Sequence, residues 1–266
     1  MGHARLFLSV FSFLLVTPLV MAQPSAALSL EWGDVLNAGG LVGAGARGAD
    51  TQGVDHQEDQ LPLNGTGVQS VHVSNRFGDW GEAELNVGSR SVSGAAAAGV
   101  PLGSFHEGNG WGWTNGGVEG QFHVTGGSGQ VVIPMEISGW FSADGGFGSG
   151  DGSVSASIRD GEENQIWSFF GQYDASGGPF SLLEQIVLQL EEGQNYTYLL
   201  SVGVDVFAME SSERPRRDAA SGGELAVSLG DGLAQPVPEP SAALLLAPGL
   251  VGLFLARRVR KSGARA

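Results

Sequence analysis

The chain has 266 residues, with 44 glycines, no cysteine and a formal net charge of −15. The lack of cysteine excludes disulfides, thiolate metal sites and thiol catalysis. All 28 acidic residues but only 7 of the 13 basic ones lie between Glu31 and Glu239, so this span carries 7 − 28 = −21, repels phosphate and predicts no nucleic-acid partner.

An apolar run from Leu6 to Val20 follows the basic residue Arg5 at the N-terminus. The run ends in Val20-Met21-Ala22, which places small residues at the −3 and −1 positions of a cleavage site. This layout is typical of a secretory signal peptide, and the run is short for a membrane span. We expect residues 1–22 to form a cleavable signal helix and residues 23–236 to form the folded body.

The body begins with a polar, glycine-rich stretch at residues 41–63, which we expect to be a long loop. Residues 68–73 and 82–87 alternate between apolar and polar side chains, as strands with one buried face do. A chain so rich in glycine suits a many-turned β fold better than a helical one. The first part of the body therefore predicts strands.

Two tryptophans, Trp111 and Trp113, stand two residues apart in the glycine-rich stretch 108–117. At this spacing they point to the same side of an extended strand. Exposed indoles can lie against sugar rings as they do against other flat apolar faces, although tryptophan is more often part of a core. The sequence leaves both interpretations open.

Three hairpins are expected in the second half of the body. They pair residues 121–124 with 131–138, residues 153–159 with 165–172, and residues 184–190 with 196–207. Pro134 assigns its strand to a sheet edge or a bulge, because proline cannot donate to a ladder. About nine or ten short strands without a strong helix predict an all-β fold, an antiparallel two-sheet sandwich of jelly-roll type.

The glycine-rich stretch 144–152 carries the carboxylates of Asp144 and Asp151. These side chains, with nearby carbonyl groups, make a candidate calcium loop, because calcium prefers oxygen ligands. The alternating acids of an EF-hand are absent, so an ordinary loop between strands explains the stretch as well. Apart from this calcium candidate, no cofactor is expected.

The C-terminal part has three sections in a fixed order. Pro238-Glu239-Pro240 comes first, followed by a mostly apolar run over residues 241–256 and a basic cluster made of Arg257, Arg258, Arg260 and Lys261. Sixteen helical residues span about 24 Å, which is marginal for a hydrocarbon core of about 30 Å. The basic cluster would stay on the cytoplasmic side and place the acidic body outside the inner membrane.

This order, in a chain that also begins with a signal peptide, resembles the PEP-CTERM sorting signal of exported bacterial proteins. The resemblance covers residues 237–261. It implies a single transmembrane helix, an exosortase-type protease as a processing partner, and a bacterium that makes extracellular polysaccharide. It also implies an inner-membrane intermediate, followed by the cell surface or the extracellular matrix.

Three functions remain for the body. The first is a structural or adhesive role without catalysis. The second is a carbohydrate-binding module that contacts exported polysaccharide through Trp111 and Trp113. The third is a surface glycoside hydrolase, since Glu82 and Glu84 share one strand face, although outward residues of any half-buried strand do the same. No nucleophile elbow, phosphate loop or dinucleotide fingerprint is present, so no enzyme is expected.

Overall fold

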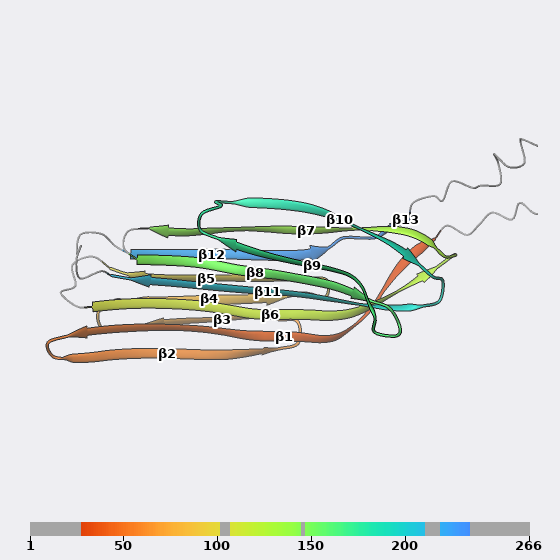
Figure 1. Cartoon of the computed structure of the whole chain (residues 1–266). Helices are drawn as coiled ribbons and strands as arrows, with labels where there is room; N and C mark the ends of the chain where they lie inside the picture. Colours follow the sequence, from red (N-terminus) through yellow and green to blue (C-terminus); the bar gives the residue numbers. More distant parts are fainter. Residues whose placement is uncertain (1–27, 102–106, 145–146, 211–218, 235–266) are drawn as a thin grey trace, which may run out of the picture.

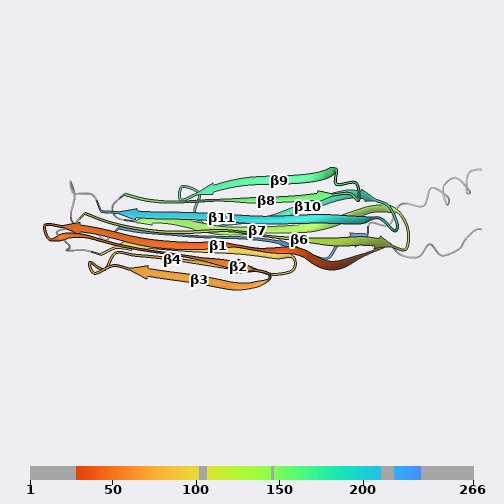
Figure 2. The ribbon, with the colours of Figure 1, turned by 90° about the horizontal axis from the view of Figure 1, so that it is seen from below.

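The computed structural model describes residues 28–101, 107–144, 147–210 and 219–234, and these form two antiparallel sheets packed face to face (Figure 1, Figure 2). The six-stranded sheet has the order β2 (Gly53–Asn64), β1 (Ser29–Asp50), β6 (Glu107–Thr125), β11 (Asn195–Met209), β8 (Phe147–Arg159) and β9 (Gln165–Asp174). The seven-stranded sheet has the order β10 (Phe180–Leu190), β7 (Gly129–Asp144), β12 (Ala219–Leu229), β5 (Ser91–Val100), β4 (Trp80–Val87) and β3 (Gly67–Ser74), with β13 (Leu233–Ala234) also paired to β7.

The predicted all-β sandwich of antiparallel sheets is confirmed for these residues. The predicted signal helix and C-terminal helix lie outside them. Within the described ranges, no helical segment combines the length and the apolar character that a membrane span requires.

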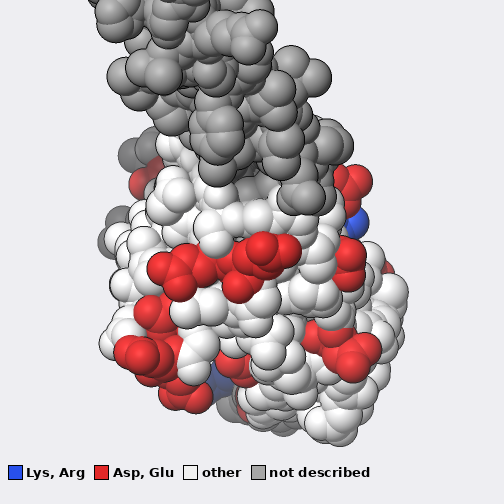
Figure 3. Space-filling model, turned by 90° about the vertical axis from the view of Figure 1, so that its right-hand side faces the viewer, with Lys and Arg blue, Asp and Glu red and all other residues white. Residues whose placement is uncertain are grey.

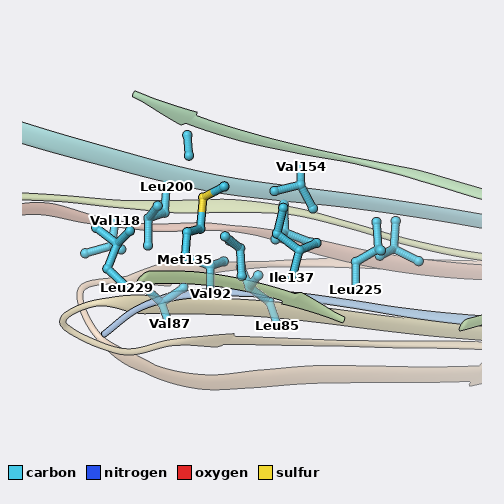
Figure 4. Packing of buried hydrophobic residues seen from close by; sticks show 14 of the residues in the cluster. Leu85, Val87, Val92, Val118, Met135, Ile137, Val154, Leu200, Leu225 and Leu229 are labelled. Carbon is cyan, nitrogen blue, oxygen red and sulfur yellow. The ribbon is translucent and has the colours of Figure 1, made fainter. Parts of the chain in front are cut away.

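The core lies between the sheets and is formed by alternate residues of almost every strand. Leu85, Val118, Met135 and Leu200 are fully or almost fully buried there (Figure 4). Burial of each such side chain stabilises the fold by about 1.5–3 kcal/mol. Side chains on the intervening positions face outward, so each sheet presents one outer face to solvent.

Near one end of the sandwich the two sheets approach until their backbones touch, and the inward positions there are glycines. A Cβ atom added at Gly110 would lie 2.1 Å from the Trp80 carbonyl oxygen, and one added at Gly112 would lie 2.2 Å from that of Glu82. One added at Gly81 would lie 2.0 Å from the Trp111 carbonyl oxygen. Only glycine fits these positions, and the alternation of β6 then directs Trp111 outward.

The prediction of a long loop at residues 41–63 is wrong. This stretch forms the second part of β1 and almost all of β2, which pair continuously from Gly39↔Asn64 to Asp50↔Gly53. Glycine lowers strand propensity because it has no side chain to pack, and β2 is polar because it lies at a sheet edge. Its partners, rather than its own composition, make this stretch extended.

One of the three predicted hairpins is confirmed, and two are wrong. Strands β8 and β9 pair as expected, from Ser153↔Gln172 to Arg159↔Gln165. In contrast, β6 and β7 belong to different sheets, as do β10 and β11, so both connections cross the sandwich. A turn between two alternating strands has the same local sequence pattern whether the second strand pairs with the first or packs against it.

Of the two alternatives for the Pro134 strand, the edge is wrong, whereas an irregularity of the bulge kind is present: between Leu229↔Met135 and Leu233↔Val132 the β12–β13 side has one residue more than β7. Strand β7 is an interior strand that pairs with β10 on one side and with β12 on the other. The Pro134 carbonyl accepts a hydrogen bond of 2.8 Å from the Gly230 amide, so the proline nitrogen faces the same side. Pairing with β12 ends at Leu229 and pairing with β13 begins at Leu233, and the missing donor falls in this gap.

Candidate functional site

Trp111 and Trp113 lie on the outer face of the six-stranded sheet, where both are half-buried. Each indole lies across a glycine of β1. A Cβ atom added at Gly43 would be 2.5 Å from Trp113 Cε2, and one added at Gly45 would be 2.1 Å from Trp111 Cζ2. The two rings therefore rest on the strand beside them and form a surface that we call the tryptophan platform, made of Trp111 and Trp113.

Strand β2 extends this aromatic surface at the sheet edge. The His56 ring stacks on Trp111, with ring centroids 5.7 Å apart and an interplanar angle of 27°. His56 Nε2 lies 3.6 Å from Glu58 Oε2, which gives the ring a second contact. Together these contacts limit the movement of the His56 and Trp111 rings at this end of the tryptophan platform.

A hollow of about 300 Å³ adjoins Trp113 on the side away from β1. Its floor is Gly203 of β11, where an added Cβ atom would meet nothing closer than 3.5 Å. We call it the glycine hollow. Its polar lining consists of Asn115, Asp151, Ser153, Gln172 and Asp205. Pairing brings these residues together from four neighbouring strands.

Two carboxylates face each other at one side of the glycine hollow, because Asp205 pairs in register with Asp151. Withdrawal of the Asp205 carboxyl from water raises its pKa above the ordinary value of 3.8, and the neighbouring Asp151 charge raises it further. Both effects disfavour the ionised form of Asp205 in the folded protein. A hydroxyl donor placed between the two carboxylates would relieve this repulsion.

We expect Asp205→Asn to stabilise the protein more at pH 7 than at pH 4. A carboxyl with a raised pKa is destabilising when ionised, and the penalty disappears as the pH falls through its folded pKa. The pKa values of Asp55, Asp160 and Asp174 are lowered by hydrogen bonds, so acidification weakens the wild type and the variant equally at those sites. Thermal unfolding of both proteins across this pH range measures the difference, and an equal gain at both values would contradict the assignment.

The other predicted site residues are placed as follows. Asp144 ends β7 in the seven-stranded sheet, whereas Asp151 lies on β8 in the six-stranded sheet. Within the described ranges, no group of three or more His, Asp or Glu side chains could hold a metal ion. The calcium loop between them therefore stays a prediction. The tail residues lie outside the described residues: Pro238, Glu239, Pro240, Arg257, Arg258, Arg260 and Lys261.

The sequence did not point to Gly43, Gly45, Gly203 or Asp205 as parts of the site. The signal that could have found the first two is the Gly-x-Gly spacing in β1, which matches the Trp-x-Trp spacing in β6. Pairing of Gly43 with Trp113 and of Gly45 with Trp111 places each small residue beside a large one. The hollow at Gly203 depends on strand order, which the local pattern does not reveal.

No protein-family model and no curated protein matches the chain. Among solved structures, the module TmCBM61 in complex with β-1,4-galactotriose matches at 11% identity and a TM-score of 0.18, covering 60% of this chain and 80% of that one. A carbohydrate-binding module of the β-sandwich superfamily matches at 9% identity and a TM-score of 0.20, covering 79% of this chain and 100% of that one. The structure of the Gx strain of infectious bursal disease virus matches at 8% identity and a TM-score of 0.21, covering 91% of this chain and 77% of that one. These values assign no family.

Proposed function

We propose that this protein is an exported, non-catalytic β-sandwich that binds polysaccharide through the tryptophan platform and the glycine hollow. The observation that carries the proposal is the placement of two indoles flat over Gly43 and Gly45, beside a polar hollow. The flat C–H face of a sugar ring stacks on an indole, and its hydroxyls hydrogen-bond at the ring edge.

The lining of the glycine hollow suits hydroxyl groups. Asn115 and Gln172 each offer an amide donor and a carbonyl acceptor, and Asp151 and Asp205 accept when ionised. A ring stacked on Trp113 would direct hydroxyls towards these groups, since Trp113 itself lines the hollow. Binding of a neutral or weakly charged polymer fits better than binding of an anionic one, because the hollow carries two carboxylates.

Glycoside hydrolysis is the second candidate, and the Asp151–Asp205 pair favours it. A retaining glycosidase uses two carboxyl groups about 5–5.5 Å apart, one of them with a raised pKa. However, both aspartates rise side by side from one sheet face, and a glycosidase places its pair on opposite sides of the bond to be cleaved. Binding is therefore the better-supported function.

An array of neutral polysaccharides and oligosaccharides, probed with the purified chain, tests the proposal. We expect retention on at least one neutral polymer and no release of reducing ends. Release of reducing ends that Asp205→Asn abolishes would favour the hydrolase instead. An absence of binding to every sugar would leave a structural role and refute the proposed function.

The acidic body is suited to the exported location that the two ends of the sequence predict. Figure 3 shows acidic side chains gathered on one end of the sandwich, with far fewer basic ones. There Asp160, Glu162 and Glu191 line one hollow, brought together by the β8–β9 and β10–β11 turns. Such a surface repels anionic headgroups and nucleic acid, so we assign sorting to the C-terminal tail, residues 237–261.

Replacing both Pro238 and Pro240 with Ala is expected to block removal of the tail. Neither residue lies in the apolar run, so an ordinary membrane anchor would not respond to this change. A protease that recognises the extended Pro-Glu-Pro stretch would leave the variant uncut in the inner membrane. Intact-mass measurement in the native host distinguishes these outcomes, and a wild-type protein that still ends at Ala266 would contradict processing.

A further inference from the structure

A second hollow lies on the outer face of the seven-stranded sheet, on the opposite side of the molecule from the tryptophan platform. It has a volume of about 520 Å³. Its floor is formed by Ala95 and Ala97 of β5. We call it the alanine trough, and its remaining outward-facing lining is Ser70, His72, Glu82, Glu84 and Trp140.

Trp140 forms one wall of the alanine trough. Its side chain is 40% exposed, and its ring reaches across Gly222 of β12, where an added Cβ atom would lie 3.1 Å from Trp140 Cη2. Trp140 Nε1 donates a hydrogen bond of 3.2 Å to Glu224 Oε2. The indole is therefore held from below and at its edge, with one side open to the trough.

Carboxylates surround the alanine floor. The register places Glu84, Ala95 and Glu224 in one row across β4, β5 and β12. Strands are about 4.8 Å apart, so the Cα atoms of the two glutamates are about 10 Å apart. Glu82 Oε2 lies 3.4 Å from His72 Nδ1, whereas no described residue pairs with Glu84. No Lys or Arg is part of the lining.

We infer that the alanine trough binds an amino sugar, that is, a unit of a polysaccharide that carries free ammonium groups. An ammonium group between the walls would form a charge-assisted hydrogen bond with Glu84 and a cation–π contact with Trp140. The apolar face of the same ring would lie on the alanine methyl groups. Negative charge on both sides of an uncharged floor complements a ring with a positive substituent.

A sugar fits this surface better than an extended peptide does. The backbone N–H and C=O groups of β4, β5 and β12 are already used within the sheet, so a peptide would find no ladder to join. Sugar hydroxyls need only side-chain partners, which Ser70 and Glu82 provide. The inference does not rest on the tryptophan platform, because the two surfaces belong to different sheets.

Calorimetric titration of the full chain at pH 6 with a glucosamine hexamer and with its fully N-acetylated form tests the inference. An amine is protonated at this pH, whereas the acetylated form carries no charge. We expect the amine form to bind at least tenfold more tightly. Glu84→Gln should weaken that binding about tenfold, and Trp140→Ala should weaken it at least as much.

Glu136→Gln is the matched control, because it removes the same charge from an exposed position of the same sheet outside the trough. It should leave binding within twofold of the wild type. Equal losses for Glu84→Gln and Glu136→Gln would show general attraction to an acidic protein and overturn the inference. A loss with Trp113→Ala alone would move the ligand to the platform, and equal binding of the acetylated form would also refute the inference. If Trp140→Ala fails to fold, comparison of Glu84→Gln with Glu136→Gln still decides whether the ligand binds in the alanine trough.

Discussion

Trp113→Ala is expected to weaken binding of a neutral polysaccharide roughly 30-fold, which corresponds to about 2 kcal/mol. Trp113 is the residue that belongs to both the tryptophan platform and the lining of the glycine hollow. Its loss removes the stacking surface and one wall of the polar hollow together. Affinity electrophoresis or calorimetry with the polymer found on the array measures the change.

Trp80→Ala is the control for this experiment. Trp80 also lies over a glycine, since a Cβ atom added at Gly99 would be 2.6 Å from Trp80 Nε1, but it belongs to the seven-stranded sheet. The control removes the same side chain from a similar setting and should leave neutral-polymer binding unchanged. Equal losses in both variants would place the effect in stability and contradict the platform.

Gly43→Ala offers a finer test of the same surface. The added methyl group would lie 2.5 Å from the Trp113 ring, so the indole must tilt away from β1. We expect weaker binding although every side chain of the platform is still present. Retained affinity would show that flat placement of the ring is unimportant.

Gly112→Val is expected to destabilise the protein by about 3 kcal/mol, at the upper end of the usual range for overpacking. An added Cβ atom would be 2.2 Å from the Glu82 carbonyl oxygen and 3.1 Å from that of Ala97, and backbone cannot move aside as a side chain can. For a chain of this size, such a change lowers the Tm by roughly 6–12 °C. Thermal unfolding followed by circular dichroism measures it.

Gly203→Val provides the matched control, because it makes the same substitution in a neighbouring strand of the same sheet. Space is available there, and valine favours extended backbone more than glycine does. The Tm of this variant should stay close to that of the wild type, while sugar binding falls because the side chain fills the glycine hollow. A large loss of stability in this variant would contradict the open floor of the hollow.

The sequence predicted the class of fold because alternation depends only on local chemistry. It also predicted the strands at residues 68–73 and 82–87, where apolar side chains alternate with polar ones. It failed at β1 and β2, where glycine replaces the apolar residues that usually mark a strand. Strand β1 is held extended by pairing with β6, which is more than 60 residues away from most of β1 along the chain, and β2 is held by pairing with β1.

The site could be predicted only in part. Trp111 and Trp113 were candidates by spacing alone, and their place on an outer face follows from the inward glycines of β6. The Gly-Trp-Gly-Trp pattern favours the surface over the core wherever two sheets are in close contact, because the glycines must then face inward and the tryptophans outward. The calcium loop of Asp144 and Asp151 stays a prediction, and the structure also pairs Asp151 in register with Asp205 on β11. That pairing depends on strand order, which sequence neighbours do not reveal.

The two outer faces belong to one slab, in which the mean planes of packed sheets lie about 10 Å apart. A neutral polymer strand on the tryptophan platform and an amine-bearing strand in the alanine trough would therefore be held on opposite sides of one rigid body. Each protein molecule would then act as a crosslink between two strands, and many such molecules would turn a viscous polymer solution into a gel. A variant that loses one face would still bind the polymer of the other face, but its mixtures with the two polymers would flow.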